Sequence, residues 1–271
     1  MNFRGSRLGF WFRRRNRAKT KRVLVFYDNY TYVCIESSGE GGTTINVFND
    51  WYTTSGDVNP GDDVWPNIHA REIAAGNIPE LVVGYANLPA DLSVYDHIWD
   101  IGYVSPYASN PTVNPTSVLT QYIQQGGAMF MLGDNAGLNR SYPPEFPDNT
   151  RYETIIQFIS GLNGGLINTN PYNPPIIITA NILPQFLIVN NTPTVDFDDP
   201  GYFVNFDRAT PVTEGLNIGD NMSYPAIMWE TGSLWTAPLG AVMAILDVNF
   251  LTTIELQPDF IDNIIASLNQ R

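Results

Sequence analysis

Cysteine, histidine and lysine are scarce in this sequence of 271 residues, and each scarcity excludes a kind of chemistry. Cys34 is the single cysteine, so an intramolecular disulfide cannot form and a cysteine-rich metal site is ruled out. No lysine follows Lys21. No apolar run approaches the roughly 18 residues that a membrane-spanning helix needs, so we expect neither a secretory signal peptide nor a membrane anchor.

The charges are divided unequally along the chain. The first 22 residues hold nine of the 14 basic side chains and no acid, which leaves five arginines against all 27 carboxylates, a net charge of −22, in the remainder. Such an arm is typical of segments that reach a negatively charged surface: a nucleic acid, a membrane surface or the acidic body of a neighbouring copy. The arm residues that we expect to bind a partner are Arg4, Arg7, Trp11, Arg13, Arg14, Arg15, Arg17, Lys19 and Lys21.

Short apolar runs alternate with helix-like segments after the arm. The runs predict strands at 21–27, 96–101, 128–132, 176–179, 186–189 and 241–246. Helical spacing and end signals predict helices at 67–75, 117–125, 150–162 and 259–268, whereas 45–52 suits either a helix or a strand. We therefore expect an α/β domain over residues 22–271, preceded by an extended basic arm over residues 1–21. Its central sheet should be mostly parallel, with an antiparallel hairpin from 226–246 at one edge.

Several stretches carry a family resemblance when they are taken in order. They are RVLVFYDN (22–29), YDHIWDIGY (95–103), TQYIQQGGAMFMLGDN (120–135) and ATPVTEGLN (209–217), followed by GAVMAILDVNFL (240–251) and FIDNIIASL (260–268). This order resembles the class I glutamine amidotransferase-like superfamily, and more closely its uncharacterised bacterial and phage members that lack the catalytic triad. The resemblance implies a flavodoxin-like three-layer sandwich.

The same resemblance argues against catalysis. In catalytic members, the turn after the GG-containing strand presents a nucleophilic cysteine, which a downstream histidine and glutamate serve. Here Asp134 and Asn135 occupy that turn, and both histidines, His69 and His97, precede it. A thiol without a neighbouring base is not activated, so we expect neither glutaminase activity nor a catalytic residue in this chain.

Three predicted strands each end in an acid followed by an amide. The carboxylates are Asp28, Asp134 and Asp247, and the amides are Asn29, Asn135 and Asn249. Carboxyl ends of parallel strands line one crevice, where three carboxylates would suit Ca²⁺ or Mg²⁺; apart from such an ion, we expect no cofactor. Alternatively, these residues terminate strands and cap the following turns. Arg140 and Arg151 follow the second pair, either as a clamp for an anion or a sugar or as salt-bridge partners.

The remaining candidates have ordinary structural explanations beside functional ones. His97 lies in a predicted strand and His69 in a predicted helix, so a packing role is expected for both, as for Cys34. Trp229 and Trp235 lie within the predicted hairpin, where they would pack in the core, in a protein interface or against a carbohydrate.

These patterns favour a non-catalytic structural or interaction subunit of a larger assembly, such as a virion or another repetitive, extracellular assembly. Its partners would be other protein chains, in a homo-oligomer or large assembly, with the arm docked on a neighbouring acidic chain. The alternative is a metal-assisted hydrolase or a carbohydrate-active or carbohydrate-binding protein that uses the acidic crevice. Nucleic acid could bind through the arm only, because the acidic body would repel the same polymer.

Overall fold

The structure is a computed structural model that describes a defined set of residues. They are 20–27, 64–83, 87–101, 118–133, 177–198, 200–203, 206–218, 221–247, 249–251 and 256–271, with the backbone of 33–37 and 43–47. The helix expected at 150–162 and most of the arm lie outside them.

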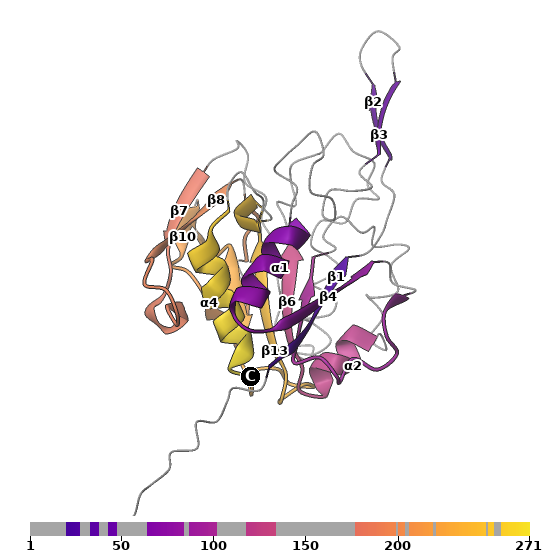
Figure 1. The fold of residues 1–271 in the computed structure, drawn as a ribbon. Helices are drawn as coiled ribbons and strands as arrows, with labels where there is room; N and C mark the ends of the chain where they lie inside the picture. The colour runs from indigo at the N-terminus through magenta and orange to yellow at the C-terminus, as the bar shows by residue number, and fades with distance from the viewer. Residues whose placement is uncertain are drawn as a thin grey trace, which may run out of the picture.

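A seven-stranded sheet forms the centre of the molecule, in the order β4-β1-β5-β6-β13-β12-β9 (Figure 1). The first five strands are mutually parallel, which confirms the mostly parallel sheet. The strands are β1 (Arg22–Tyr27), β4 (Ile78–Val83), β5 (His97–Asp100), β6 (Ala128–Gly133), β9 (Thr210–Pro211), β12 (Ala226–Trp229) and β13 (Ala241–Leu246). The antiparallel pair expected from 226–246 is β12 and β13, but the short strand β9, not this pair, forms the edge.

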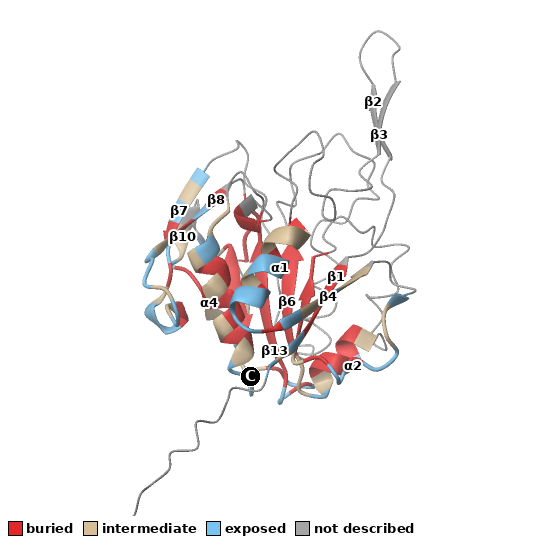
Figure 2. Ribbon diagram, viewed as in Figure 1, coloured by how far each residue is buried: buried red, intermediate tan, exposed pale blue. Residues whose placement is uncertain are grey.

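In the described part of the chain, three helices cover the two faces of this sheet: α1 (Val64–Ala74), α2 (Val118–Gln124) and α4 (Pro258–Asn269). On one face, Trp99 and Phe130 pack with Ile68 of α1 and Ile264 of α4. On the other face, the neighbouring positions Ile98 and Met129 pack with side chains of α2. The parallel strands β5, β6 and β13 are therefore buried on both sides (Figure 2), as their continuous apolar runs indicate, whereas the edge strand β4 is partly exposed.

Three two-stranded antiparallel sheets complete the described elements. They pair β2 (Val33–Ser37) with β3 (Thr43–Val47), β7 (Ile177–Asn181) with β8 (Thr194–Asp198), and β10 (Leu216–Ile218) with β11 (Asn221–Ser223). The strand expected at 186–189 is wrong: Pro184–Phe186 forms a 3₁₀ turn, η4, and an irregular loop follows. Pro184 favours the turn because its fixed φ suits the first helical position. Within the described residues, no helix is long and apolar enough to cross a membrane.

Candidate functional site

The carboxyl edge of the parallel strands is where the sequence predicted a cation or polar-ligand site. Asp28, Asn29, Asp134, Asn135, Arg140 and Arg151 lie outside the described residues, and Asn249 begins the 3₁₀ turn η5 (Asn249–Leu251). Asp247 directly follows β13 and is fully buried. Asp100, which was not among the predicted site residues, ends β5 and is also fully buried. Both acids have interaction partners, and no cluster of three metal-ligating side chains occurs in the described part of the chain.

A buried polar network joins α1 to the opposite, amino edge of the sheet. The Glu72 carboxylate accepts hydrogen bonds from Trp99 Nε1 at 2.6 Å and from Asn77 Nδ2 at 2.6 Å, and it lies 2.7 Å from His97 Nε2. Glu72, His97 and Trp99 are all fully buried. His97 thus lies in the core, as expected, and its Nε2 pairs with an acid from a helix 25 residues away in sequence, whereas its buried Nδ1 has no hydrogen-bond partner among the described residues.

The basic arm joins the body at this same amino edge. The Lys21 ammonium donates a hydrogen bond of 2.6 Å to the carbonyl of Asn269, at the carboxyl end of α4, and Ile78 N–H donates to the Lys21 carbonyl. A cation near the last carbonyls of a helix is favourable because the helix dipole is negative there. Lys21 therefore anchors the root of the arm on its own body; the other predicted partner-binding residues lie outside the described part.

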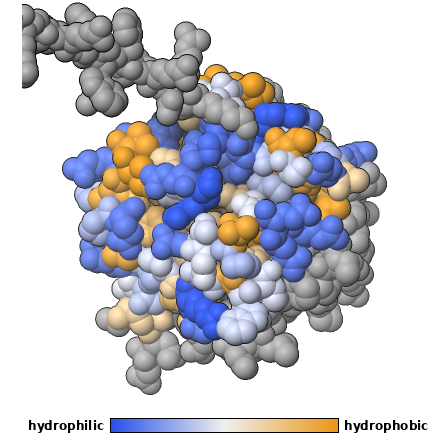
Figure 3. Space-filling model, turned by 90° about the horizontal axis from the view of Figure 1, so that it is seen from below, coloured by the Kyte–Doolittle hydropathy of each residue, from blue (hydrophilic) through white to orange (hydrophobic). Residues whose placement is uncertain are grey.

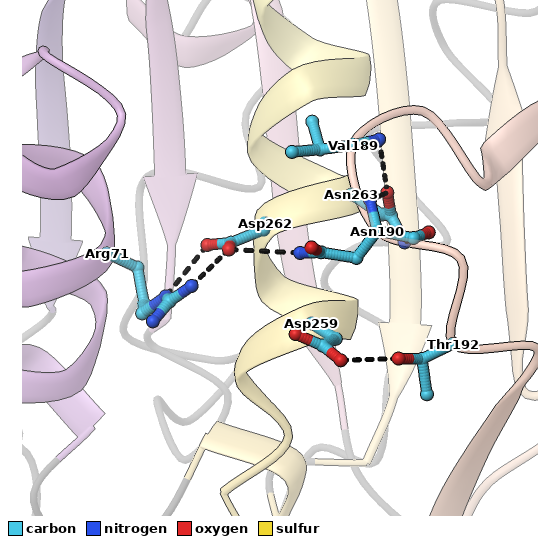
Figure 4. Close-up of polar contacts among 7 residues, drawn as sticks. All are labelled: Arg71, Val189, Asn190, Thr192, Asp259, Asp262 and Asn263. Carbon is cyan, nitrogen blue, oxygen red and sulfur yellow. Dashed lines mark hydrogen bonds and ion pairs between the residues drawn. The ribbon is translucent and has the colours of Figure 1, made fainter.

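A loop that follows η4, residues 187–193, is fastened to α4 by side chains of that helix (Figure 4). Asn263 Oδ1 accepts three successive backbone N–H groups, from Ile188 at 3.0 Å, Val189 at 2.9 Å and Asn190 at 3.2 Å. Asn263 Nδ2 returns a hydrogen bond to the Asn190 carbonyl at 3.1 Å. We call this loop, together with Asn263, the clasp.

Two carboxylates of α4 extend the clasp. Asp262 accepts a bond from Asn190 Nδ2 at 3.1 Å and forms a two-pronged ion pair with Arg71 of α1, whose Nε lies 2.7 Å from Oδ1. Asp259 accepts a hydrogen bond from the Thr192 hydroxyl. The arrangement holds the loop in one conformation because both its backbone and its polar side chains have fixed partners.

The clasp also displays apolar side chains to solvent. Val189 is 62% exposed and Ile188 is 36% exposed, although both lie on a loop with a fixed backbone. Asp196 of β8 exchanges two backbone hydrogen bonds with Gln257, next to the start of α4, but its carboxylate accepts a hydrogen bond from Thr179 of β7. The two exposed aliphatic side chains therefore lie on a loop whose next residues, Asn190 and Thr192, bond to the carboxylates of Asp262 and Asp259.

The described cations of the body are already engaged. Arg22 pairs with Glu80, Arg71 with Asp262, Arg208 with Asp207 and Arg271 with Glu230. In contrast, Asp196, Glu214 and Asp259 accept hydrogen bonds from the neutral groups of Thr179, Asn181 and Thr192. The negative charge at these three positions is therefore not balanced by a contacting cation within the described residues.

The two tryptophans of the β12–β13 hairpin have different surroundings. Trp229 is fully buried and donates a hydrogen bond of 3.0 Å to the Asp207 carbonyl, so it belongs to the core. Trp235 is 67% exposed and has the Arg208 guanidinium 5.1 Å from its ring centre. The surface that faces downward in Figure 1 shows separate apolar patches between hydrophilic side chains (Figure 3).

The fold and these surfaces define a mixed α/β protein with a mostly parallel central sheet. No family model matches the sequence, and no curated protein matches it. Solved structures do match in fold. The cytoplasmic protein STM3548 from Salmonella typhimurium is 14% identical, with a TM-score of 0.53 over 92% of this chain and 98% of that chain.

Two further structures show that the fold occurs in different settings. The mmIFT52 N-terminal domain is 10% identical, with a TM-score of 0.52 over 92% of this chain and 96% of that chain. The cold-adapted β-galactosidase from Rahnella sp. R3 is 10% identical, with a TM-score of 0.50, and the match covers 93% of this chain but 31% of the enzyme. At these identities the similarity establishes the fold alone.

Proposed function

We propose that this protein is a non-catalytic interaction subunit of a larger assembly, in which the basic arm docks on the acidic body of a neighbouring copy. The observation that carries the proposal is the separation of charge: +9 in the first 22 residues against −22 in the rest. The paired state of the body cations adds support, because Arg71, Arg208 and Arg271, the arginines after residue 22 that the structure describes, already have acidic partners. Such an exchange of arms between copies would suit a virion or another repetitive assembly.

The proposal includes a flavodoxin-like arrangement of the body and kinship with the glutamine amidotransferase-like superfamily. Numbered by their order in the chain, the five parallel strands run 2-1-3-4-5 across the sheet, which is the flavodoxin-like order. The helices on both faces agree with it. The buried packing of His97 supports a non-catalytic role, since this imidazole lies in the core at the amino edge of the sheet.

Removal of the arm tests this function. Deleting residues 2–19 leaves Lys21 and its bond to Asn269 in place, so the truncated body should melt as cooperatively as the full chain. Its assembly should be lost, and assembly of the full chain should weaken as salt rises, because exposed charge pairs are screened over about 8 Å at physiological ionic strength. Light scattering and thermal melts measure the two properties. Unchanged particle size after truncation would refute the proposal.

A second candidate function is favoured by the two buried carboxylates, Asp100 and Asp247, at the carboxyl edge of the sheet. A metal-assisted hydrolase or a carbohydrate-active protein would place Ca²⁺ or Mg²⁺ there, with Asp28 and Asp134 as further ligands. A bound ion at a hundred times its Kd stabilises a fold by about 2.7 kcal/mol. The test is a thermal melt with and without each ion, in the natural chain and in Asp247→Asn, with the exposed Asp196→Asn as the control. Melting points that do not respond to either ion would remove this candidate.

A further inference from the structure

We infer that the clasp is the receptor for the arm: the basic arm of a second copy docks over Ile188 and Val189, on the loop that Asp259 and Asp262 hold. This inference rests on the proposed function and assigns the docking surface within it. The surface comes from a predicted strand that the structure shows to be a loop. No feature of the sequence pattern marked it as a binding site.

The first argument is that the surface is built in advance. Three backbone N–H groups of the loop converge on Asn263 Oδ1, and Asn263 itself is only 2% exposed. An irregular loop normally loses conformational freedom when it binds, which opposes association. Here the loop is already ordered, so an arriving segment meets apolar side chains in fixed positions.

The second argument is chemical complementarity. The arm places arginines among aromatic residues, with Phe10, Trp11 and Phe12 directly before Arg13. Aromatic rings cover exposed aliphatic side chains, and guanidinium groups pair with carboxylates at the rim of the same contact. The clasp offers both kinds of partner. Ile188 and Val189 supply the apolar centre, and the Asp259 carboxylate accepts its present hydrogen bond from a neutral donor, the Thr192 hydroxyl.

The third argument is position. The root of the arm and the clasp lie along the same helix, since Lys21 bonds to Asn269 near the end of α4 and Thr192 bonds to Asp259 near its start. Ten residues of helix separate these points by about 15 Å. Two copies that face each other through α4 can thus exchange arms reciprocally, because each carries a root and a receptor along this one helix. Such an exchange closes as a pair with two-fold symmetry.

Cross-linking between copies tests the location directly. One population carries Ser6→Cys and the other Val189→Cys, both in the full chain with Cys34→Ala, and a short bismaleimide joins thiols that lie close together. We expect a linked heterodimer in the mixture. The matched control is Leu239→Cys, because Leu239 is 66% exposed but lies before β13, at the amino edge of the sheet. Equal linking at Leu239 and Val189 would overturn the inference. A chain with both substitutions that links only within itself would overturn it as well.

Assembly strength provides the second readout. Ile188→Ser with Val189→Ser removes the apolar side chains but keeps the backbone N–H groups that Asn263 binds, so the fold should persist. We expect the Kd for self-association, measured by sedimentation, to rise about tenfold in this variant and also in Asp259→Asn. Leu239→Ser and the pair Asp91→Asn with Asp207→Asn serve as controls and should change it less than twofold.

The two proposals fail in distinguishable ways. If deletion of the arm abolishes assembly while the clasp variants behave like their controls, the arm docks elsewhere and only the present inference is wrong. If deletion of the arm leaves assembly intact, the proposed function itself is wrong. A thermal melt of each clasp variant checks that a loss of assembly does not come from unfolding.

Discussion

Asn263 makes the clasp unusually dependent on one side chain, and Asn263→Ala is the sharpest test of how it is held. The substitution removes three bonds accepted by Oδ1 and one donated by Nδ2. At a net of about 0.5 to 1.5 kcal/mol each, four bonds amount to about 2 to 6 kcal/mol. Two effects reduce the loss: water reaches the partly buried N–H groups, and alanine favours the helix over asparagine by up to about 0.7 kcal/mol.

We therefore expect Asn263→Ala to lower the free energy of unfolding by about 3 kcal/mol, which corresponds to a melting point lower by about 6 to 12 °C. Urea unfolding measures the change as a lower midpoint with an unchanged slope, since little surface is newly exposed in the native state. The control is Thr192→Ala, which removes a single exposed bond to Asp259 and should cost less than about 1 kcal/mol. A loss in Asn263→Ala no larger than in this control would refute the structural role given to Asn263.

Two other changes test the packing of α2 and of the hairpin loop. Burial raises the pKa of the Tyr122 hydroxyl. The stability that its neutral form contributes is therefore complete below the unfolded pKa of about 10 and is lost as pH rises above that value. Tyr122→Phe should flatten this alkaline loss of stability in thermal melts recorded between about pH 8 and 12. Gly240→Ala would bring a Cβ within 2.2 Å of the Ile123 carbonyl oxygen and should cost several kcal/mol, whereas Gly232→Ala, at φ 93° with open space around it, should cost about 1 to 2 kcal/mol. Equal urea midpoints for the two alanine variants would contradict the close approach at Gly240.

The sequence predicted the central elements because the apolar pattern of each one is contained in its own short segment of the chain. Continuous apolar runs marked β1, β5, β6 and β13, and helical spacing with end signals marked α2 and α4. Strand β4 was missed because Pro79 and Glu80 interrupt its apolar pattern. That interruption is tolerated at a sheet edge, where β4 lies and where an unpaired backbone position accommodates proline.

The clasp could not be predicted, because its contacts join residues far apart in the chain. The run Phe186–Val189 looks uniformly apolar, yet Phe186 is buried and Val189 is exposed, and only the position of α4 decides between them. Asn263 lies 73 residues from Asn190, and Glu72 lies 27 residues from Trp99. Within the predicted crevice, Asp247 was recognised and Asp100 was not, because the acid ending β5 has no amide directly after it as Asp28 and Asp134 do.

Adjacent positions of α1 point in two directions, and this has a mechanical consequence. Arg71 grips Asp262, which holds Asn190 of the clasp, whereas Glu72 grips Trp99 in the middle of the sheet. Polar contacts thus tie the loop to α4 and α4 to α1, and the backbone of α1 connects them to the contact between Glu72 and strand β5. Lifting the loop would leave the buried Asn263 amide without its partners, whereas the Arg71–Asp262 and Glu72–Trp99 contacts would stay in place. Tension applied through a docked arm would therefore pass from the loop into α4, and from there through Arg71 into α1.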